Sequence, residues 1–171
     1  MSLAGLLARR RVALGWMVVV ATLVLARPTW ATWRIGLAIA AAGEVIRVWA
    51  AGHLEKSREV TRSGPYRWTR HPLYVGSSIM ALGIVIAARS GVVAVVAAIY
   101  MTSTLTAAIR TEEAFLSQAF GDTYERYRGS RAEPMRRRFS LARAMRNREY
   151  RSMAGLAAGF ALLALKVFGY L

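Results

Sequence analysis

Residues 64–76 read GPYRWTRHPLYVG and lead directly into an apolar run that ends at Ala88. Proline, tyrosine, tryptophan, arginine and histidine are crowded into this short stretch. Gly64-Pro65 predicts a turn, because proline fixes φ and glycine relaxes the sterics beside it. Pro72 suits the first turn of a helix, where a backbone N–H would lack a helical partner anyway. The stretch therefore predicts a polar, aromatic site at the start of an apolar helix.

The composition around this stretch is that of a membrane protein. The 171 residues fit one domain, 56% of them are hydrophobic, and the apolar residues come in blocks. The chain has no cysteine, which excludes disulfides, thiolate metal sites and a cysteine nucleophile. In so apolar a chain, the net charge of +15 indicates anionic lipid headgroups rather than nucleic acid. The basic segment 131–148 predicts a solvated arm on those headgroups, with direct substrate contact as the alternative.

The apolar blocks predict an all-α integral membrane bundle of about five transmembrane helices. A helix needs about 20 residues to cross the hydrocarbon, so the first and third spans are short. Only Arg89 and Ser90 join the third span to the fourth, which predicts a tight antiparallel hairpin. The chain is one membrane domain, 1–171, with a core at about 53–130, a basic arm at 131–151 and an extra C-terminal span. The predicted spans are 12–26, 30–52, 72–88, 91–109 and 152–171.

Positive charge predicts the orientation of this bundle. Three arginines at 9–11, five basic residues at 56–70 and eleven at 110–151 fall on one side if all five spans are real. Only Arg27, Arg34 and Arg89 lie at or near the other side. We therefore expect a cytoplasmic N-terminus, both basic segments in the cytoplasm and the C-terminus outside. Residues 1–26 also have the pattern of a signal peptide, but the charge count favours a retained helix.

Two groups of charged residues near the predicted cytoplasmic face could bind a ligand. Arg70 and His71 stand before a helix start that would attract an anion, although lipid-interface residues would look the same. Glu112 and Glu113 end the fourth span, where they would oppose the helix macrodipole. Salt bridges are the plain explanation for them. The predicted hairpin would instead bring Glu112 near His71 and Tyr74, in a pocket suited to a zwitterion such as an amino-acid head group.

Other polar or small residues have structural interpretations. Glu44 and Arg47 are one turn apart inside the second span and can neutralise each other. His53 is one of only two histidines, and no metal-ligand spacing such as HExxH occurs, so no metal site is predicted. Gly155 and Gly159 form a GxxxG pattern typical of helix packing, within the chain or in a homo-oligomer.

Two motifs carry a family resemblance. They are GPYxxxRHPxYxG at 64–76 and EExxLxxxFGxxYxxY at 112–127. Over about 60–127 the chain resembles the isoprenylcysteine carboxyl methyltransferase family and its relatives among the phospholipid N-methyltransferases. The resemblance implies S-adenosylmethionine as methyl donor, S-adenosylhomocysteine as product, and a membrane-embedded site that opens to the cytoplasm. The zwitterionic end of that donor agrees with the pocket inferred from the charges.

The resemblance also implies roles for individual residues. It suggests that Tyr66 lies against the adenine of the donor and that Glu112 holds its amino group. The donor site as a whole is expected to comprise Arg58, Glu59, Val60, Thr61, Tyr66, His71, Pro72, Leu73, Tyr74, Gly76 and Glu112.

The acceptor is expected to be a lipid-like or small amphiphile with a carboxylate, amine or thiol. Arg70 and Glu113 are the predicted catalytic residues, and Glu113 or His71 would be the base that an amine or thiol needs. Carboxyl-methylating relatives have an arginine one turn before the first glutamate of the second motif, but this chain has Ala108. Arg110, the substrate-binding candidate, is two residues away and on nearly the opposite helix face. The resemblance therefore does not imply that this chain recognises a prenylcysteine carboxylate.

The alternative class is a non-catalytic lipid-binding or assembly protein of the same fold, which would not bind the donor.

Overall fold

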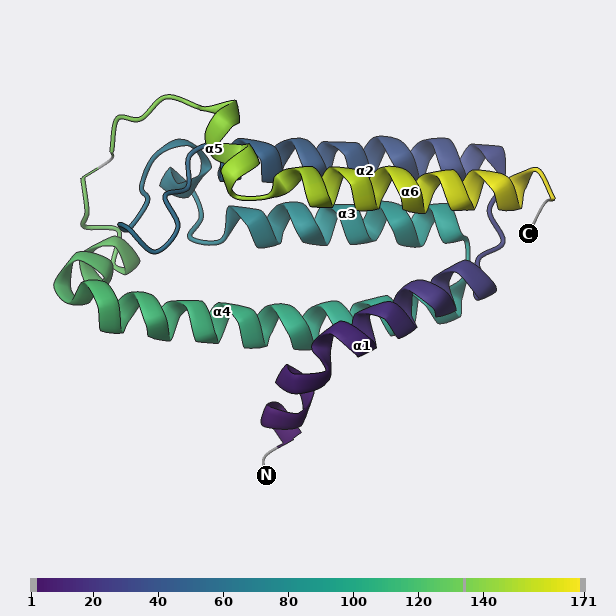
Figure 1. Ribbon diagram of the computed structural model, residues 1–171, viewed down its shortest axis with the longest axis horizontal. Helices are drawn as coiled ribbons and strands as arrows, with labels where there is room; N and C mark the ends of the chain where they lie inside the picture. The colour runs from purple at the N-terminus through teal and green to yellow at the C-terminus, as the bar shows by residue number, and fades with distance from the viewer. Residues whose placement is uncertain (1–2, 134, 170–171) are drawn as a thin grey trace.

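The computed structural model describes residues 3–133 and 135–169, with side chains described from residue 13 onward (Figure 1). No strand occurs in the described ranges, so the all-α prediction is confirmed. The elements are α1 (Leu3–Leu25), α2 (Trp30–Ala51), the 3₁₀ turn η1 (Gly64–Arg67), α3 (Pro72–Ala88), α4 (Gly91–Arg128), α5 (Leu141–Arg146) and α6 (Glu149–Val167).

Within the described residues, two helices, α4 and α6, are long and apolar enough to cross a membrane. The apolar part of α1 (Ala13–Leu25) and the whole of α3 are shorter. Helix α2 has the length of a span but carries Arg34, Glu44 and Arg47. The count of five spans therefore stays a prediction, although α3 has the predicted bounds and α2 ends one residue early.

The fourth helix differs from its prediction. Helix α4 continues well past the apolar run, through a break at Gly121 (φ 42°, ψ −123°), to Arg128. Glu112 and Glu113 therefore lie inside a helix. The prediction that they oppose the macrodipole at a helix C-terminus is wrong. The apolar run marks where the predicted span ends, whereas the alanine, glutamate and leucine that follow are good helix formers in water as well.

Helices α2 and α3 pack backbone against backbone through glycine. A Cβ built on Gly43 would lie 2.6 Å from the carbonyl oxygen of Gly76, and one built on Gly36 would lie 2.4 Å from that of Gly83. Real Cβ atoms are not found at such distances, so only glycine allows this approach. By contrast, a Cβ on Gly155 or Gly159 would meet no atom of the described residues within 4 Å. The predicted GxxxG pattern thus makes no helix contact among those residues, and its role between chains stays a prediction.

A buried polar network ties α2 to α6. The predicted Glu44–Arg47 pair exists, with Arg47 Nε 3.8 Å from Glu44 Oε2. Arg47 has closer contacts with Glu149, because its Nη2 donates to both carboxylate oxygens at 3.0 Å. Ser152 completes the network by donating to Glu44 Oε2 at 2.7 Å. Removing one partner would leave a buried charge uncompensated, so the network fixes the position of α6 on α2.

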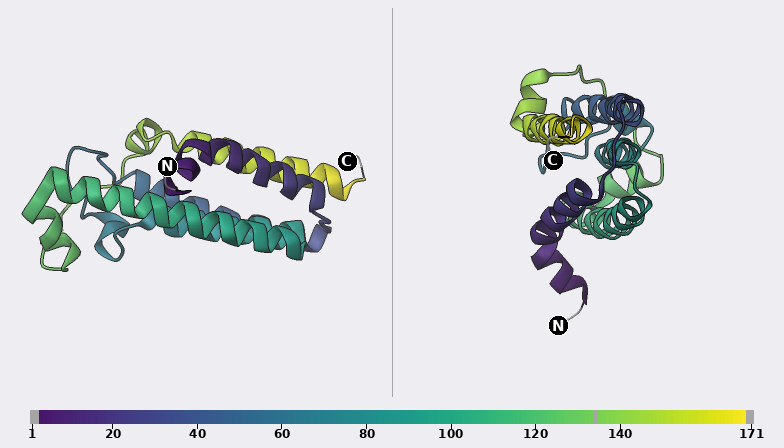
Figure 2. Two further views of the ribbon diagram at one scale, coloured as in Figure 1. Left: turned by 90° about the horizontal axis from the view of Figure 1, so that it is seen from below. Right: turned by 90° about the vertical axis from the view of Figure 1, so that its right-hand side faces the viewer.

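The remaining helices form a second group. Figure 2 shows α2, α3 and α6 together in the end-on view, with α1 and α4 beside them. Arg89, in the left-handed conformation (φ 49°), and Ser90, whose hydroxyl accepts from Val93 N, form the predicted tight connection between α3 and α4. From that turn the two helices run antiparallel and their axes diverge towards the other end of the molecule (Figure 1).

The connections at the opposite end of the bundle pack on one another. The segment between α2 and α3 and the segment between α4 and α6 lie side by side there (Figure 1). The basic arm is therefore not simply a solvated tail, because it includes α5 and folds back on residues 52–59 through hydrogen bonds and ion pairs. The sequence missed this because arginines that pair across about 80 residues leave no local pattern.

Candidate functional site

A cavity of about 1430 Å³ lies where α4 diverges from α3. Most of its wall comes from five segments: the α2–α3 connection, η1, the start of α3, the middle of α4 and the α5–α6 corner. The charged lining residues gather near the connections, which form the polar end, whereas α4 adds apolar residues such as Ile99 together with hydroxyl residues such as Thr102 and Ser103. This mixed lining fits an amphiphile.

Most of the residues predicted to bind the donor line this cavity. From the first connection these are Glu59, Val60, Thr61 and Tyr66, from α3 Leu73 and Tyr74, and from α4 Glu112. Arg70 and Arg110 line it as well, together with Ala108. Five predicted site residues are not in the wall: Arg58, His71, Pro72, Gly76 and Glu113.

His71 and Glu113 join α3 to α4 behind the wall. Glu113 Oε1 lies 3.0 Å from His71 Nε2 and 3.1 Å from Arg70 Nη1. Glu112 Oε2 is 4.0 Å from His71 Nδ1, too far for a hydrogen bond. Glu112 is thus near His71 as the sequence predicts, with its carboxylate on the cavity. Glu113 is engaged by Arg70 and His71 and does not line the cavity, so its arrangement is that of a helix-joining residue.

Tyr66 brings the two sequence motifs together. Its ring is buried in the cavity wall, and its carbonyl oxygen accepts a 2.7 Å hydrogen bond from the hydroxyl of Tyr127, the last residue of the second motif. Burial, followed by the charge of Glu112, raises the pKa of Tyr66 well above its ordinary value of 10. Tyr66 therefore presents a neutral hydroxyl and an aromatic face, while Tyr127 fixes the backbone that carries it.

Pro72 and Gly76 have positions that support α3. Pro72 is buried at the first turn, and the residue before it, His71, makes no side-chain hydrogen bond that caps the helix. A Cβ on Gly76 would lie 2.6 Å from Arg47 Cγ, so this glycine faces α2. Both residues place the start of α3, and neither faces the cavity.

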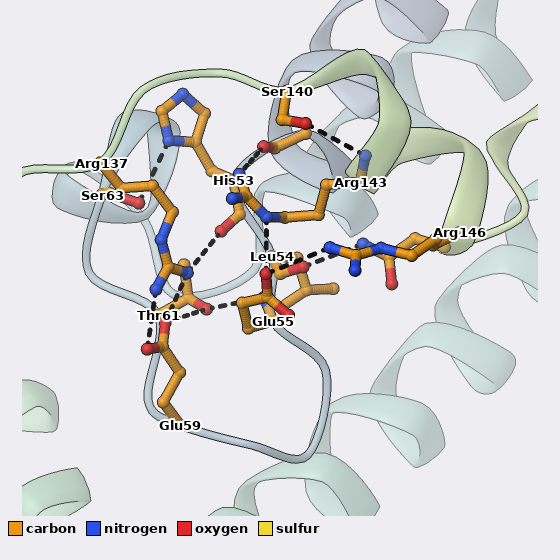
Figure 3. Close-up of polar contacts among 12 residues, drawn as sticks. His53, Leu54, Glu55, Glu59, Thr61, Ser63, Arg137, Ser140, Arg143 and Arg146 are labelled. Carbon is orange, nitrogen blue, oxygen red and sulfur yellow. Dashed lines mark hydrogen bonds and ion pairs between the residues drawn. The ribbon is translucent and has the colours of Figure 1, made fainter.

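The basic arm clamps the connection that forms one side of the cavity (Figure 3). Arg137 donates to both oxygens of Glu59, at 2.6 and 2.8 Å. Arg143 donates from Nε to Glu55 at 2.7 Å and from Nη1 to the carbonyl of Gly52 at 2.6 Å. Paired, oriented arginine–carboxylate contacts of this kind restrict geometry as well as adding energy. Glu59 lines the cavity, so Arg137 restrains part of the site.

His53 lies under the same clamp. Its ring is buried, with Nδ1 3.1 Å from the hydroxyl of Ser63. Gly64, at φ 56°, makes room for it, because a Cβ there would lie 2.5 Å from the imidazole. Burial, then the charges of Arg143 and Arg137, lower the pKa of His53 from its ordinary 6.5. His53 is therefore a packed, neutral residue of the clamp.

Several lining residues were missed by sequence reasoning. Phe115, Leu116 and Tyr127 fall inside the second motif and could have been chosen by their helical spacing. Other lining residues give no sequence signal, because distant parts of the chain bring them to the cavity. Among them are Lys56 and Ser57 from the first connection, and Arg146, Asn147, Arg148 and Glu149 from the α5–α6 corner.

Several known proteins are similar in sequence to this chain, two of them over about two thirds of its length or more. The cobalt-zinc-cadmium resistance protein CzcN of Cupriavidus metallidurans is 33% identical over an alignment of 140 residues that covers 72% of this chain and 63% of that protein. The nickel-cobalt-cadmium resistance protein NccN of Alcaligenes xylosoxydans xylosoxydans is 32% identical over an alignment of 127 residues that covers 67% of this chain and 59% of that protein. No solved structure matches the chain.

An enzyme is among these relatives. The protein-S-isoprenylcysteine O-methyltransferase of Schizosaccharomyces pombe is 34% identical over 91 residues, 53% of this chain and 39% of that protein. The chain thus spans between about two fifths and two thirds of the lengths of the three relatives. The phospholipid methyltransferase family matches residues 11–123, and with the isoprenylcysteine relative this confirms the resemblance seen in the two motifs. The chain belongs to the phospholipid methyltransferase family.

Proposed function

We propose that this protein is an integral membrane methyltransferase that uses S-adenosylmethionine and acts on a lipid-like or small amphiphilic acceptor. One observation carries the proposal: Tyr66 from the first motif and Glu112 from the second line the same cavity. The cavity lies within a chain of the phospholipid methyltransferase family. Its cytoplasmic side and its membrane topology are part of the proposal.

The residues at the polar end fit the donor. Its amino group would meet the Glu112 carboxylate, which has no lysine or arginine within 4 Å among the described residues and lies 4.0 Å from the His71 ring. Its carboxylate would be attracted by Arg70 and by the start of α3, which has no side-chain cap. The ring of Tyr66 offers an aromatic face for the adenine. Ligand pockets commonly hold about 300–1,000 Å³, so a cavity of about 1430 Å³ has room for a donor and an acceptor together.

When bound, S-adenosylmethionine supplies an electrophilic methyl group and leaves S-adenosylhomocysteine as product. The chain itself orients the two molecules and excludes water, and orientation can supply as much as about 7–11 kcal/mol of the barrier reduction. An anionic acceptor needs no base. For an amine, Glu113 and His71 are held together behind the wall, and neither lines the cavity. An acceptor that arrives deprotonated therefore suits this cavity best.

Donor binding tests the proposal directly. We expect S-adenosylhomocysteine to bind the full chain in nonionic detergent, as measured by titration calorimetry. Glu112→Gln should weaken binding by about 10–100-fold, because it removes a charge-assisted hydrogen bond. The matched control is Glu125→Gln on the same helix, which removes an exposed carboxylate outside the cavity and should leave binding unchanged.

Two outcomes would contradict the proposal. Absence of binding by the wild type at millimolar ligand would favour a non-catalytic lipid-binding or assembly protein of this fold. Equal binding by wild type and Glu112→Gln would remove Glu112 from the donor site. Incubation with methyl-labelled donor and total membrane extract, followed by identification of the labelled product, would then identify the acceptor.

A further inference from the structure

The corner between α5 and α6 is anchored on both sides of one residue, Arg148. On one side, the Asn147 side chain donates to the carbonyl oxygens of Ala51 at 2.8 Å and Leu54 at 2.9 Å. On the other side, Glu149 is 5% exposed and accepts both hydrogen bonds from Arg47. The backbone of Arg148 is thus held against the end of α2 by its two neighbours.

Arg148 itself has an unfavourable backbone conformation. Its φ of 65° lies in the left-handed region, which costs free energy for a residue with a side chain. Arg89 and Ser130 share such angles at other helix ends, so the angle alone does not indicate function. Unlike those two residues, Arg148 also lines the cavity. Ser57 across the wall combines the same two properties, with φ 60°.

The cations of the cavity wall divide into paired and unpaired groups. Arg70 pairs with Glu113, and Arg146 pairs with Glu55. Lys56, Arg110 and Arg148 have no carboxylate within 4 Å among the described residues, although each lines the cavity. These three come from the α2–α3 connection, from α4 and from the α5–α6 corner. Three elements therefore bring uncompensated positive charge to one cavity.

We propose that Arg148, assisted by Lys56 and Arg110, binds a phosphate or carboxylate group of a molecule in this cavity. The inference deepens the proposed function in taking this cavity as the reaction site. An arginine on a fixed backbone suits this role, because its planar guanidinium matches such oxyanions with two parallel hydrogen bonds. The group could belong to the acceptor head or to the donor's amino-acid end. Arg148 lies outside residues 11–123, the part that matches the family.

Substitution of Arg148 tests the proposal in the full chain in nonionic detergent. The probes are oleoyl lysophosphatidate, the phosphate-free monoolein as its neutral counterpart, and S-adenosylhomocysteine, each measured by calorimetry. Arg148→Gln removes the charge, and Arg148→Gly removes it at an angle that glycine tolerates, so a folding defect would not explain a shared effect. Arg151→Gln is the matched control, because Arg151 is exposed, lies outside the cavity wall and is three residues away.

We expect Arg148→Gln and Arg148→Gly each to weaken the binding of one anionic ligand by about tenfold. Arg148→Lys should retain part of that affinity. Weaker binding of lysophosphatidate, with monoolein unchanged, assigns the site to the acceptor. Weaker binding of S-adenosylhomocysteine assigns it to the donor. Unchanged binding of both, or an equal loss in Arg151→Gln, would overturn the proposal. If the wild type fails to bind S-adenosylhomocysteine, the proposed function fails, whereas an Arg148-dependent preference for lysophosphatidate would still support the anion site.

Discussion

His53 shows how single residues of the clamp couple the structure to pH. It is buried between the basic arm and the 3₁₀ turn, where burial and two nearby arginines lower its pKa. In the unfolded chain His53 takes up a proton near pH 6.5, whereas in the folded chain it does so only at lower pH. The contribution of His53 to stability is therefore fully present above pH 6.5 and falls as the pH decreases from there towards the lowered pKa of the folded state.

We expect the thermal unfolding midpoint of the detergent-solubilised wild type to fall between pH 7.5 and pH 5.5. One titrating group changes the free energy of unfolding by at most about 1.4 kcal/mol per pH unit. His53→Gln should flatten this dependence, because its amide can still bond to Ser63 and does not titrate. An equally steep fall in His53→Gln would show that other groups are responsible. Glu55, whose pKa is lowered from 4.5, would act only at more acidic pH.

At the scale of elements, helices α2 and α3 approach each other closely because glycines without side chains lie where they meet. Gly36 and Gly43 on α2 meet Gly83 and Gly76 on α3, a spacing of seven residues on each helix. The sequence pattern that first indicates helix packing is instead Gly155 and Gly159, with a spacing of four. Spacing alone does not distinguish these cases, because both put glycines on one helix face. Only the partner helix decides which glycines are contacts.

This difference predicts opposite outcomes for two matched substitutions. Gly43→Val should destabilise the fold by about 3 kcal/mol or more, because its Cβ would lie within 2.9 Å of two backbone atoms and a side-chain carbon of α3. Gly155→Val adds a side chain where nothing lies within 4 Å and should leave thermal stability almost unchanged.

Thermal unfolding in detergent checks both variants. A stable Gly43→Val protein would contradict the close packing of α2 on α3. Cross-linking of Gly155→Val tests the predicted homo-oligomer separately, since loss of a cross-linked dimer alone would place Gly155 at an interface between chains.

At the scale of the whole molecule, the two connections at the polar end, between α2 and α3 and between α4 and α6, both carry a net positive charge. The absence of native cysteine makes this topology directly measurable. Thr123 is exposed near the end of α4, and Gly91 is exposed at its start with open space around a Cβ, so each can be replaced by cysteine. In intact cells, a membrane-impermeant maleimide should label Gly91→Cys from outside and Thr123→Cys only after lysis. The reverse pattern would contradict a cytoplasmic active site.

The amino-acid sequence determined the helical class, the bounds of α2 and α3, and the two motifs that carry the family. These features depend on local periodicity, proline and glycine chemistry and charge bias, all of which act over short distances. Most of the predicted donor residues line the cavity for the same reason, since each motif is short and continuous. The sequence also placed Glu113 among the catalytic residues, where the structure has it paired with Arg70 and His71.

The tertiary structure alone decided which charges are free and which are paired. Arg137 with Glu59, Arg47 with Glu149 and Tyr127 with Tyr66 are separated by 61 to 102 residues. Such pairs depend on how α6 and the basic arm fold back on α2, and no local pattern encodes that return. The polar stretch at 64–76 predicts a site at the start of α3. The cavity wall, and with it the unpaired Arg148, exists only once the distant end of the chain is packed against that stretch.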